Sequence, residues 1–181
     1  RYAWKQTSKV NKLRFTFNDY FKHVGLPFKK ILSVMGIKNK KIKIKNDYDR
    51  SSIKNISRLK IYPNVLTTIN KLKKQNKSIA LFTSKDSTRT KLFTKKFKIQ
   101  FDHMECGGKS IKGKPYPDQI RKILKKFNCP RNKAVYIGDM YHDYLAAKNA
   151  GIDFIFAEYG YGGLRSLEIK WFIKNFNDLI K

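Results

Sequence analysis

Two aspartates in the C-terminal half of the chain are the residues best suited to chemistry. Asp139 follows an apolar run at 134–138, and Asp143 comes four positions later, where a helix is predicted to begin. Mg²⁺ is usually held by one or two carboxylates together with water and a substrate phosphate. We therefore expect Asp139 and Asp143 to form a magnesium site. The structural alternative is that Asp139 caps the turn and Asp143 complements the helix dipole.

Hydroxyl side chains follow a second apolar run, at 78–83. This run ends at Thr83, and Ser84 and Lys85 lead into another predicted helix. Backbone N–H groups at a helix N-terminus bind phosphate oxygens, so Thr83 and Ser84 are candidate phosphate ligands. Taken alone the signal is weak, because Ser84 or Asp86 would also serve as an ordinary helix N-cap.

A lysine lies in a stiffened loop at 113–118, before a third predicted helix. Pro115 and Pro117 restrict the backbone around Lys114. A lysine fixed there can neutralise a phosphate and a neighbouring carboxylate. In a chain this rich in lysine, a chance occurrence is the competing interpretation.

The elements that must position these residues form an alternating pattern from residue 58 onward. Apolar runs at 78–83, 134–139 and 153–157 alternate with predicted helices at 65–74, 87–97, 118–127 and 141–150. Continuous apolar runs between helices indicate a parallel sheet buried on both faces. The predicted fold class is α/β, a Rossmann-like doubly wound parallel sheet, whose site lies at the carboxyl ends of the strands.

The first third of the chain has a different pattern of apolar residues. Residues 1–57 contain helical segments that end near Gly25 and Gly36, and no buried-strand pattern. We expect a small helical cap subdomain at 1–57 and a Rossmann-like core at 58–181.

The charge balance invites a nucleic-acid function, with 41 Lys+Arg against 13 Asp+Glu and a net charge of +28. We do not expect a nucleic-acid partner, because the lysines are spread along the chain and fall on the solvent faces of predicted helices. Arginine, which recognises phosphates and bases by bidentate geometry, occurs only at positions 1, 14, 50, 58, 89, 121, 131 and 165. Compositional drift is the simpler explanation, and attraction of acidic partners or anionic substrates is the alternative.

Targeting signals and disulfides are not expected. No stretch approaches the roughly 18 apolar residues of a membrane helix, and the first residues lack the apolar run of a signal peptide. Cys106 and Cys129 match no zinc or redox spacing. We expect a soluble cytoplasmic protein with reduced thiols and no membrane partner.

Taken together, Thr83, Lys114, Asp139 and Asp143 resemble motifs two, three and four of the haloacid dehalogenase-like hydrolase superfamily. Further similarity to its phosphoglycolate phosphatase-like subgroup lies at 83–85, 113–118, 146–151 and 160–162. The resemblance implies that residues 1–57 are the helical cap of that subgroup.

The resemblance also implies the site roles. Thr83, with Ser84, would bind the transferring phosphoryl group, and Lys114 would stabilise its charge and that of the nucleophile. Asp139 would bind Mg²⁺, and Asp143 would complete or support the metal site. The implied reaction is hydrolysis of a small phosphorylated metabolite, phosphoglycolate-like or a sugar phosphate, through an aspartyl-phosphate.

One departure from the family matters. Motif one, a buried strand ending in Asp-x-Asp that supplies the nucleophile, has no match before residue 40. Asp47 and Asp49 have the right spacing, but a strand there would bury three lysines, so we expect a solvated helix or loop. We expect that the motif-one strand was lost and that this chain alone is inactive and poorly stable. The alternative function is a non-catalytic nucleic-acid-binding or regulatory relic.

Overall fold

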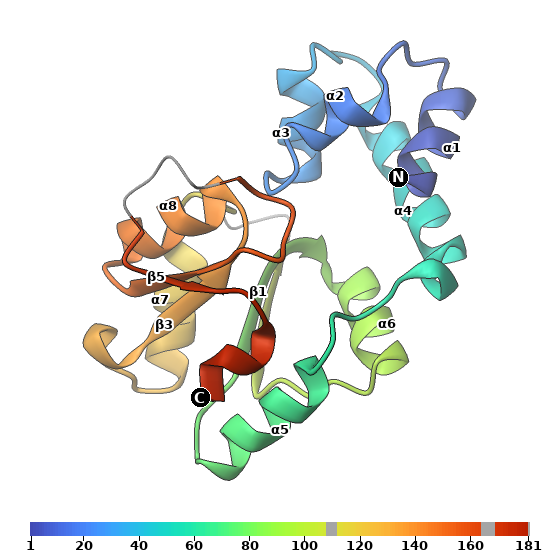
Figure 1. Cartoon of the computed structure of the whole chain (residues 1–181). Helices are drawn as coiled ribbons and strands as arrows, with labels where there is room; N and C mark the ends of the chain where they lie inside the picture. Colours follow the sequence, from blue (N-terminus) through green and yellow to red (C-terminus); the bar gives the residue numbers. More distant parts are fainter. Residues whose placement is uncertain (108–111, 164–168, 181) are drawn as a thin grey trace.

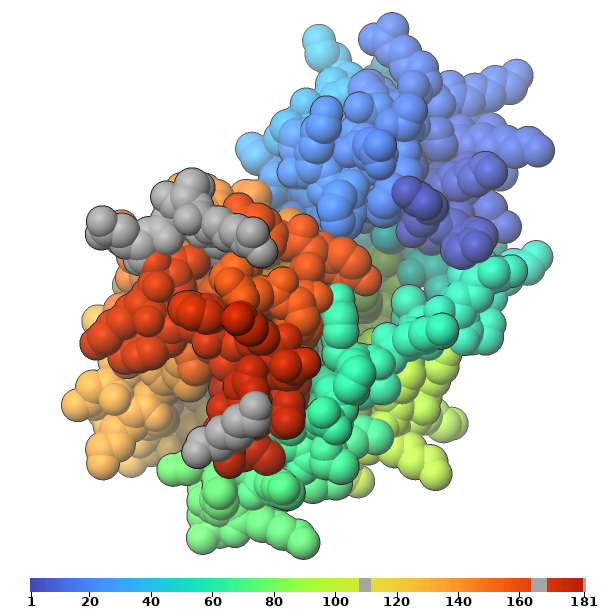
Figure 2. Space-filling model, viewed as in Figure 1, coloured from blue at the N-terminus to red at the C-terminus, as the bar shows by residue number. Residues whose placement is uncertain are grey.

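The computed structural model describes residues 1–107, 112–163 and 169–180, and it contains a group of N-terminal helices and an α/β part (Figure 1). The N-terminal helices, called here the helical unit, are α1 (Tyr2–Val10), α2 (Phe17–Phe21), α3 (Phe28–Val34), α4 (Lys41–Lys54) and the 3₁₀ turn η1 (Ile56–Arg58). Figure 2 shows the helical unit, in blue to teal, as a lobe that adjoins the α/β part.

An aromatic cluster forms the core of the helical unit. Trp4 on α1 stacks on Tyr20 of α2, with 4.4 Å between ring centroids. Phe28 of α3 and Tyr48 of α4 lie against each other with 4.5 Å between centroids. Leu32 is fully buried among them. Large apolar side chains on all four helices thus face one interior, as an amphipathic pattern predicts.

The α/β part follows the predicted alternation closely. Its helices are α5 (Val65–Lys74), α6 (Ser87–Lys96), α7 (Asp118–Lys126) and α8 (Tyr141–Ala150), with the 3₁₀ turns η2 (Arg131–Lys133) and η3 (Phe176–Ile180). Its strands are β1 (Ala80–Asp86), β2 (His103–Gly107), β3 (Val135–Gly138), β4 (Asp153–Ala157) and β5 (Trp171–Ile173). All pairings between these strands are parallel. The mixed α/β architecture with parallel strands is therefore confirmed.

The strands form two separate sheets. β1 pairs with β2, and β3, β4 and β5 form the second sheet with β4 in the middle. The two sheets meet where Phe82 of β1 contacts Tyr136 of β3, with 5.8 Å between ring centroids. Among the described residues, no strand pairs with the edges of β1 and β3 that face each other.

Burial of these inner strands differs from the prediction. We expected strands buried on both faces, yet β3 has no fully buried residue and Val135 is 48% exposed. β4, which has a partner on each side, buries Phe154, Phe156 and Ala157. The expectation is wrong for β3, because a strand with one partner leaves its other flank open.

Small residues let α8 lie close to the second sheet. Ala146, Ala147 and Ala150 are fully buried, and they join two apolar clusters beneath β1, β3 and β4. Gly151 ends the helix with a left-handed φ of 73°, a conformation that glycine adopts without a Cβ clash. The start of α8, with Asp143, is thereby fixed at the end of β3.

Two strands escaped the sequence analysis, β2 because it lacks an apolar run and β5 because it is short. β2 contains Glu105, which is 5% exposed and accepts hydrogen bonds from His103 at 2.7 Å and from Lys122 at 2.8 Å. β5 has only three residues. Within the described ranges, no helix is both long enough and apolar enough to cross a bilayer.

Candidate active site

A buried ion pair forms the centre of the candidate site. Lys114 Nζ lies 2.5 Å from Asp143 Oδ1, and both residues are less than 10% exposed. The ammonium group also lies 4.7 Å from the centroid of the Phe82 ring and 5.4 Å from that of Tyr136. Because a buried charge is costly unless it is paired, this arrangement fixes Lys114 at one place between β1 and β3.

Both oxygens of Asp143 are held by the protein. The hydroxyl of Tyr136 donates to Oδ1 at 3.1 Å, and the backbone N–H groups of Asp139 and Met140 donate to Oδ2 at 3.3 and 3.1 Å. Burial, followed by the negative charge of Asp143, raises the pKa of Tyr136 well above its usual value. Tyr136 therefore stays protonated and can donate. Asp143 also stabilises the N-terminal end of α8, which is the structural role that the sequence left open as an alternative.

Asp139 is held at the end of β3 by the backbone of residues 160–162, which approaches it closely. Tyr161 N–H donates to its Oδ2 at 2.8 Å. A Cβ added at Gly160 would lie 2.2 Å from the Asp139 Cβ, and one added at Gly162 would lie 1.7 Å from its backbone oxygen. Glycine is thus required at both positions, because only backbone without a side chain fits against Asp139.

Thr83 and Ser84 lie at the end of β1, and the hydroxyl of each has a partner. The backbone N–H of Lys85 donates to Thr83 Oγ1 at 3.1 Å. The Ser84 hydroxyl donates to the carbonyl of Gly25 in the helical unit at 2.8 Å. Asp86, the alternative capping residue, does cap α6 by accepting from Arg89 N–H at 2.9 Å.

The residues present suit a magnesium ion held mainly through Asp139. Its Oδ1 accepts no hydrogen bond from the residues that the structure describes, whereas both oxygens of Asp143 are engaged. No group of three or more acidic, His or Cys residues that could hold a metal occurs in the described ranges. Mg²⁺ needs no such cage, because it retains several waters and binds substrate phosphate.

Asp47 and Asp49 lie on helix α4, as expected for a solvated helix, and not on a strand. Asp47 pairs with Lys43 at 2.8 Å. Asp49 lies 3.2 Å from Arg89 of α6 and so joins the helical unit to the α/β part. Neither carboxylate belongs to the cluster around Lys114.

Sequence reasoning missed two contributors to the site. Tyr136 was read only as part of an apolar strand, although a buried tyrosine usually needs a partner for its hydroxyl. Tyr161 acts through its backbone N–H, which no sequence pattern reports. His142, beside Asp143, faces the helical unit, since a Cβ on Gly25 would lie 3.4 Å from its Nδ1.

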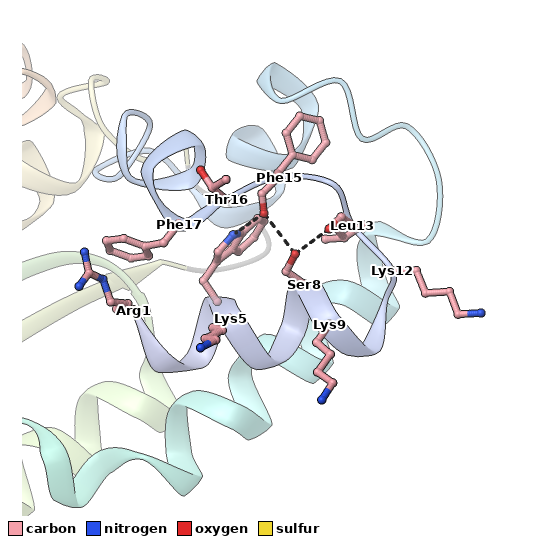
Figure 3. Close-up of a pocket in the computed structure, with 10 residues that line it drawn as sticks. Arg1, Lys5, Ser8, Lys9, Lys12, Leu13, Phe15, Thr16 and Phe17 are labelled. Carbon is pink, nitrogen blue, oxygen red and sulfur yellow. Dashed lines mark hydrogen bonds between the residues drawn. The ribbon is translucent and has the colours of Figure 1, made fainter.

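The surface pocket drawn in Figure 3 lies elsewhere, along α1 and the turn that follows it. It measures about 470 Å³ and contains none of the predicted site residues. Ser8 donates to the carbonyls of Leu13 and Phe15, and Trp4 donates to the latter carbonyl. These polar atoms hold the turn against α1, so we assign the pocket a structural origin.

The fold and the site define a class: parallel α/β proteins with a buried lysine–aspartate pair and a second aspartate at the end of a strand. Residues 3–157 match the family described as haloacid dehalogenase-like hydrolase. The chain belongs to this family.

Curated relatives include proteins named phosphoglycolate phosphatase. The one from Mannheimia succiniciproducens is 32% identical over 141 residues, which cover 74% of this chain and 61% of the relative. The one from Haemophilus influenzae is 32% identical over 120 residues, 64% of this chain and 52% of the relative. The chain therefore spans between half and two thirds of the length of these relatives.

Solved structures share the fold. A hydrolase from Pseudomonas syringae superposes with a TM-score of 0.88 at 18% identity, covering 98% of this chain and 87% of that one. The chain thus has the overall fold of a solved structure.

Proposed function

We propose that this site belongs to a magnesium-dependent phosphatase that hydrolyses a small phosphate monoester, phosphoglycolate-like or a sugar phosphate. The observation that supports it is the buried Lys114–Asp143 pair joined to Asp139 at the same end of β1 and β3. In this proposal residues 1–57 form a cap over the site and 58–181 form the core.

The proposed roles follow from the contacts. Lys114 provides a fixed positive charge for the phosphoryl oxygens, and its position is set by Asp143. Thr83 and the N-terminal end of α6 offer hydrogen-bond donors to the same oxygens. Asp139 would hold Mg²⁺, supported by Asp143, and the ion would supply charge neutralisation to the phosphoryl group. Donors fixed before the reaction stabilise the spreading negative charge without reorganisation.

The proposed nucleophile is an aspartate that the described site residues do not supply. Asp143 is excluded because both its oxygens are engaged, and Asp86 because it is bound to Arg89. An incoming carboxylate would attack phosphorus and displace the alcohol, which leaves as it takes up a proton. Water would then cleave the aspartyl-phosphate to give inorganic phosphate and the free carboxylate. We propose that the printed chain alone has no turnover.

The test compares the printed chain with the product of the same gene extended upstream of Arg1. Both are assayed with p-nitrophenyl phosphate and 2-phosphoglycolate, with Mg²⁺ and with EDTA. We expect turnover only in an extended product that carries the aspartate, and only with Mg²⁺. Asp139→Asn and Lys114→Ala should each lower kcat by about 100-fold or more. Turnover by the printed chain that neither substitution changes would contradict the proposal.

A further inference from the structure

Tyr161 contacts both the candidate metal ligand and the helical unit. Its backbone N–H donates to Asp139 Oδ2 at 2.8 Å. Its ring meets that of Phe21 on α2 edge to face, with 5.8 Å between the ring centroids and 89° between the ring planes. One residue of the α/β part thus joins the carboxylate at the end of β3 to the helical unit.

Few contacts other than Phe21 hold the ring of Tyr161. The residue is 69% exposed, and among the residues that the structure describes Phe21 supplies its one ring-to-ring contact. Its hydroxyl neighbours that of Tyr62, which precedes α5 and packs edge to face on Tyr159 with 4.9 Å between centroids. The helical unit therefore contributes directly to the position of the segment 159–161.

The backbone of 160–162 holds Asp139 in one orientation. A Cβ has no room at Gly160 or Gly162, where it would lie 2.2 Å from the Asp139 Cβ and 1.7 Å from the Asp139 backbone oxygen. With Oδ2 bound to the Tyr161 N–H, Oδ1 is the oxygen that remains for a cation. Such hydrogen bonds orient metal-binding carboxylates, and loss of one lowers metal affinity by a factor of about 10 to 100. A shift of 160–162 away from Asp139 would therefore weaken metal binding.

We propose that Phe21 and Tyr161 are positioning residues, which make the affinity of Asp139 for a divalent cation depend on the contact between the helical unit and the α/β part. While the two rings are packed, the segment 160–162 stays against Asp139, and the carboxylate keeps the orientation that leaves Oδ1 free. The metal part of this inference rests on the proposed function, and the positioning of the segment does not. Because coupling is reciprocal, a bound cation strengthens the contact between the two rings by the same factor.

The first test measures Mn²⁺ binding by the printed chain, with free Mn²⁺ followed by electron paramagnetic resonance. Mn²⁺ is the probe for a Mg²⁺ site because carboxylate and water ligands suit both ions. We expect Phe21→Ala and Tyr161→Ala each to weaken binding by about two- to tenfold, the factor that an aromatic pair contributes. Tyr161→Phe keeps the ring and should bind as the unchanged chain does. Phe17→Ala is the matched control, because Phe17 lies on the same helix and packs on Tyr20 and Phe21 inside the helical unit.

A double variant tests whether the two rings act as a pair. Phe21→Ala combined with Tyr161→Ala should bind Mn²⁺ no more weakly than either single variant, because each substitution removes the same interaction. Additive losses would overturn the proposal. A loss in Phe21→Ala no greater than that in Phe17→Ala would overturn it as well, since general loosening of α2 would then explain the effect.

Amide exchange tests the positioning without a metal. The rate at which the Tyr161 N–H exchanges with water, measured by NMR, should rise by about two- to tenfold in Phe21→Ala. The control is the N–H of Asn175, which also donates to a carboxylate oxygen, Asp178 Oδ2, at 2.9 Å and should exchange at an unchanged rate. An unchanged rate at Tyr161 would overturn the proposal.

Asp139→Asn separates this inference from the proposed function, because it should abolish saturable Mn²⁺ binding. If it leaves the affinity unchanged, the proposed metal site fails together with the metal part of this inference, and amide exchange alone decides whether Phe21 holds 160–162. If Asp139→Asn abolishes binding while Phe21→Ala has no effect, the proposed metal site stands and the coupling to the helical unit is overturned.

Discussion

The helical unit and the α/β part bury different kinds of side chain. The helical unit buries Trp4, Tyr20 and Leu32, and its carboxylates Asp47 and Asp49 remain at or near the surface. The α/β part buries the charged residues Lys114, Asp143 and Glu105. Because charges are buried only where partners are fixed, this contrast separates a region built for packing from one built around a polar site.

The largest expected effect comes from breaking the buried pair. Lys114→Met leaves Asp143 buried without its partner and should lower the free energy of unfolding by about 3–5 kcal/mol. Urea denaturation followed by circular dichroism measures it. The exposed control is Lys43→Met, which breaks the pair with Asp47 and should change stability by less than about 0.5 kcal/mol.

A double variant sharpens this result. Lys114→Met combined with Asp143→Asn removes both charges and should recover part of the loss, because the amide oxygen of Asn still accepts hydrogen bonds at a position where Asp143 accepts from Tyr136 and from two backbone N–H groups. If the double variant were as unstable as the single one, packing and not charge would explain the effect.

The second effect tests the packing of the helical unit. Leu32→Ala opens a cavity at a fully buried position and should cost about 2–5 kcal/mol. The chain has two tryptophans, of which Trp4 lies in this core, so a Trp171→Phe background makes fluorescence report on the helical unit alone. Val34→Ala, at a position 50% exposed, is the matched control and should have little effect.

Much of this comparison could be predicted from the sequence. The sequence predicted the observed bounds of three elements, the helices 65–74 and 141–150 and the strand 153–157. In these segments the spacing of apolar residues and the positions of turn-forming residues indicate the same boundaries. β1 was expected to end at Thr83 and continues to Asp86. β2 was missed because Glu105 interrupts it, and only tertiary partners from α7 make its burial tolerable.

The candidate site was predicted in part. Lys114 and Asp143 are brought together as a pair, and Asp139 lies next to them at the end of β3. The sequence could not show that Tyr136 reaches Asp143 or that backbone from 160–162 closes on Asp139. Such contacts depend on distances across the fold, which residue types and spacing do not encode.

A third and smaller effect tests the close packing around the aspartates. A Cβ at Gly138 would lie 2.5 Å from the Asp143 Cβ, so Gly138→Ala must displace that side chain and should cost about 1–3 kcal/mol. Gly163→Ala is the control, because a Cβ there meets nothing within 4 Å. Equal thermal stability of the two variants would contradict the tight contact.

The smallest effect concerns pH and His142, which lies between the two regions. Burial, with the charges of Lys114 and His23, lowers its pKa, and Asp143 opposes this shift. A base with a lowered pKa binds fewer protons in the folded state. Its stabilising contribution is therefore present above the unfolded value of about 6.5 and is lost as pH falls through the lower folded value.

We therefore expect His142→Gln to flatten the decline in stability between about pH 7 and pH 5. Urea midpoints at matched ionic strength measure the slope, and the difference should be modest because His142 is partly exposed and screened. An unchanged slope in His142→Gln would show that burial between the two regions does not perturb this side chain, and that the polar site ends at Asp143.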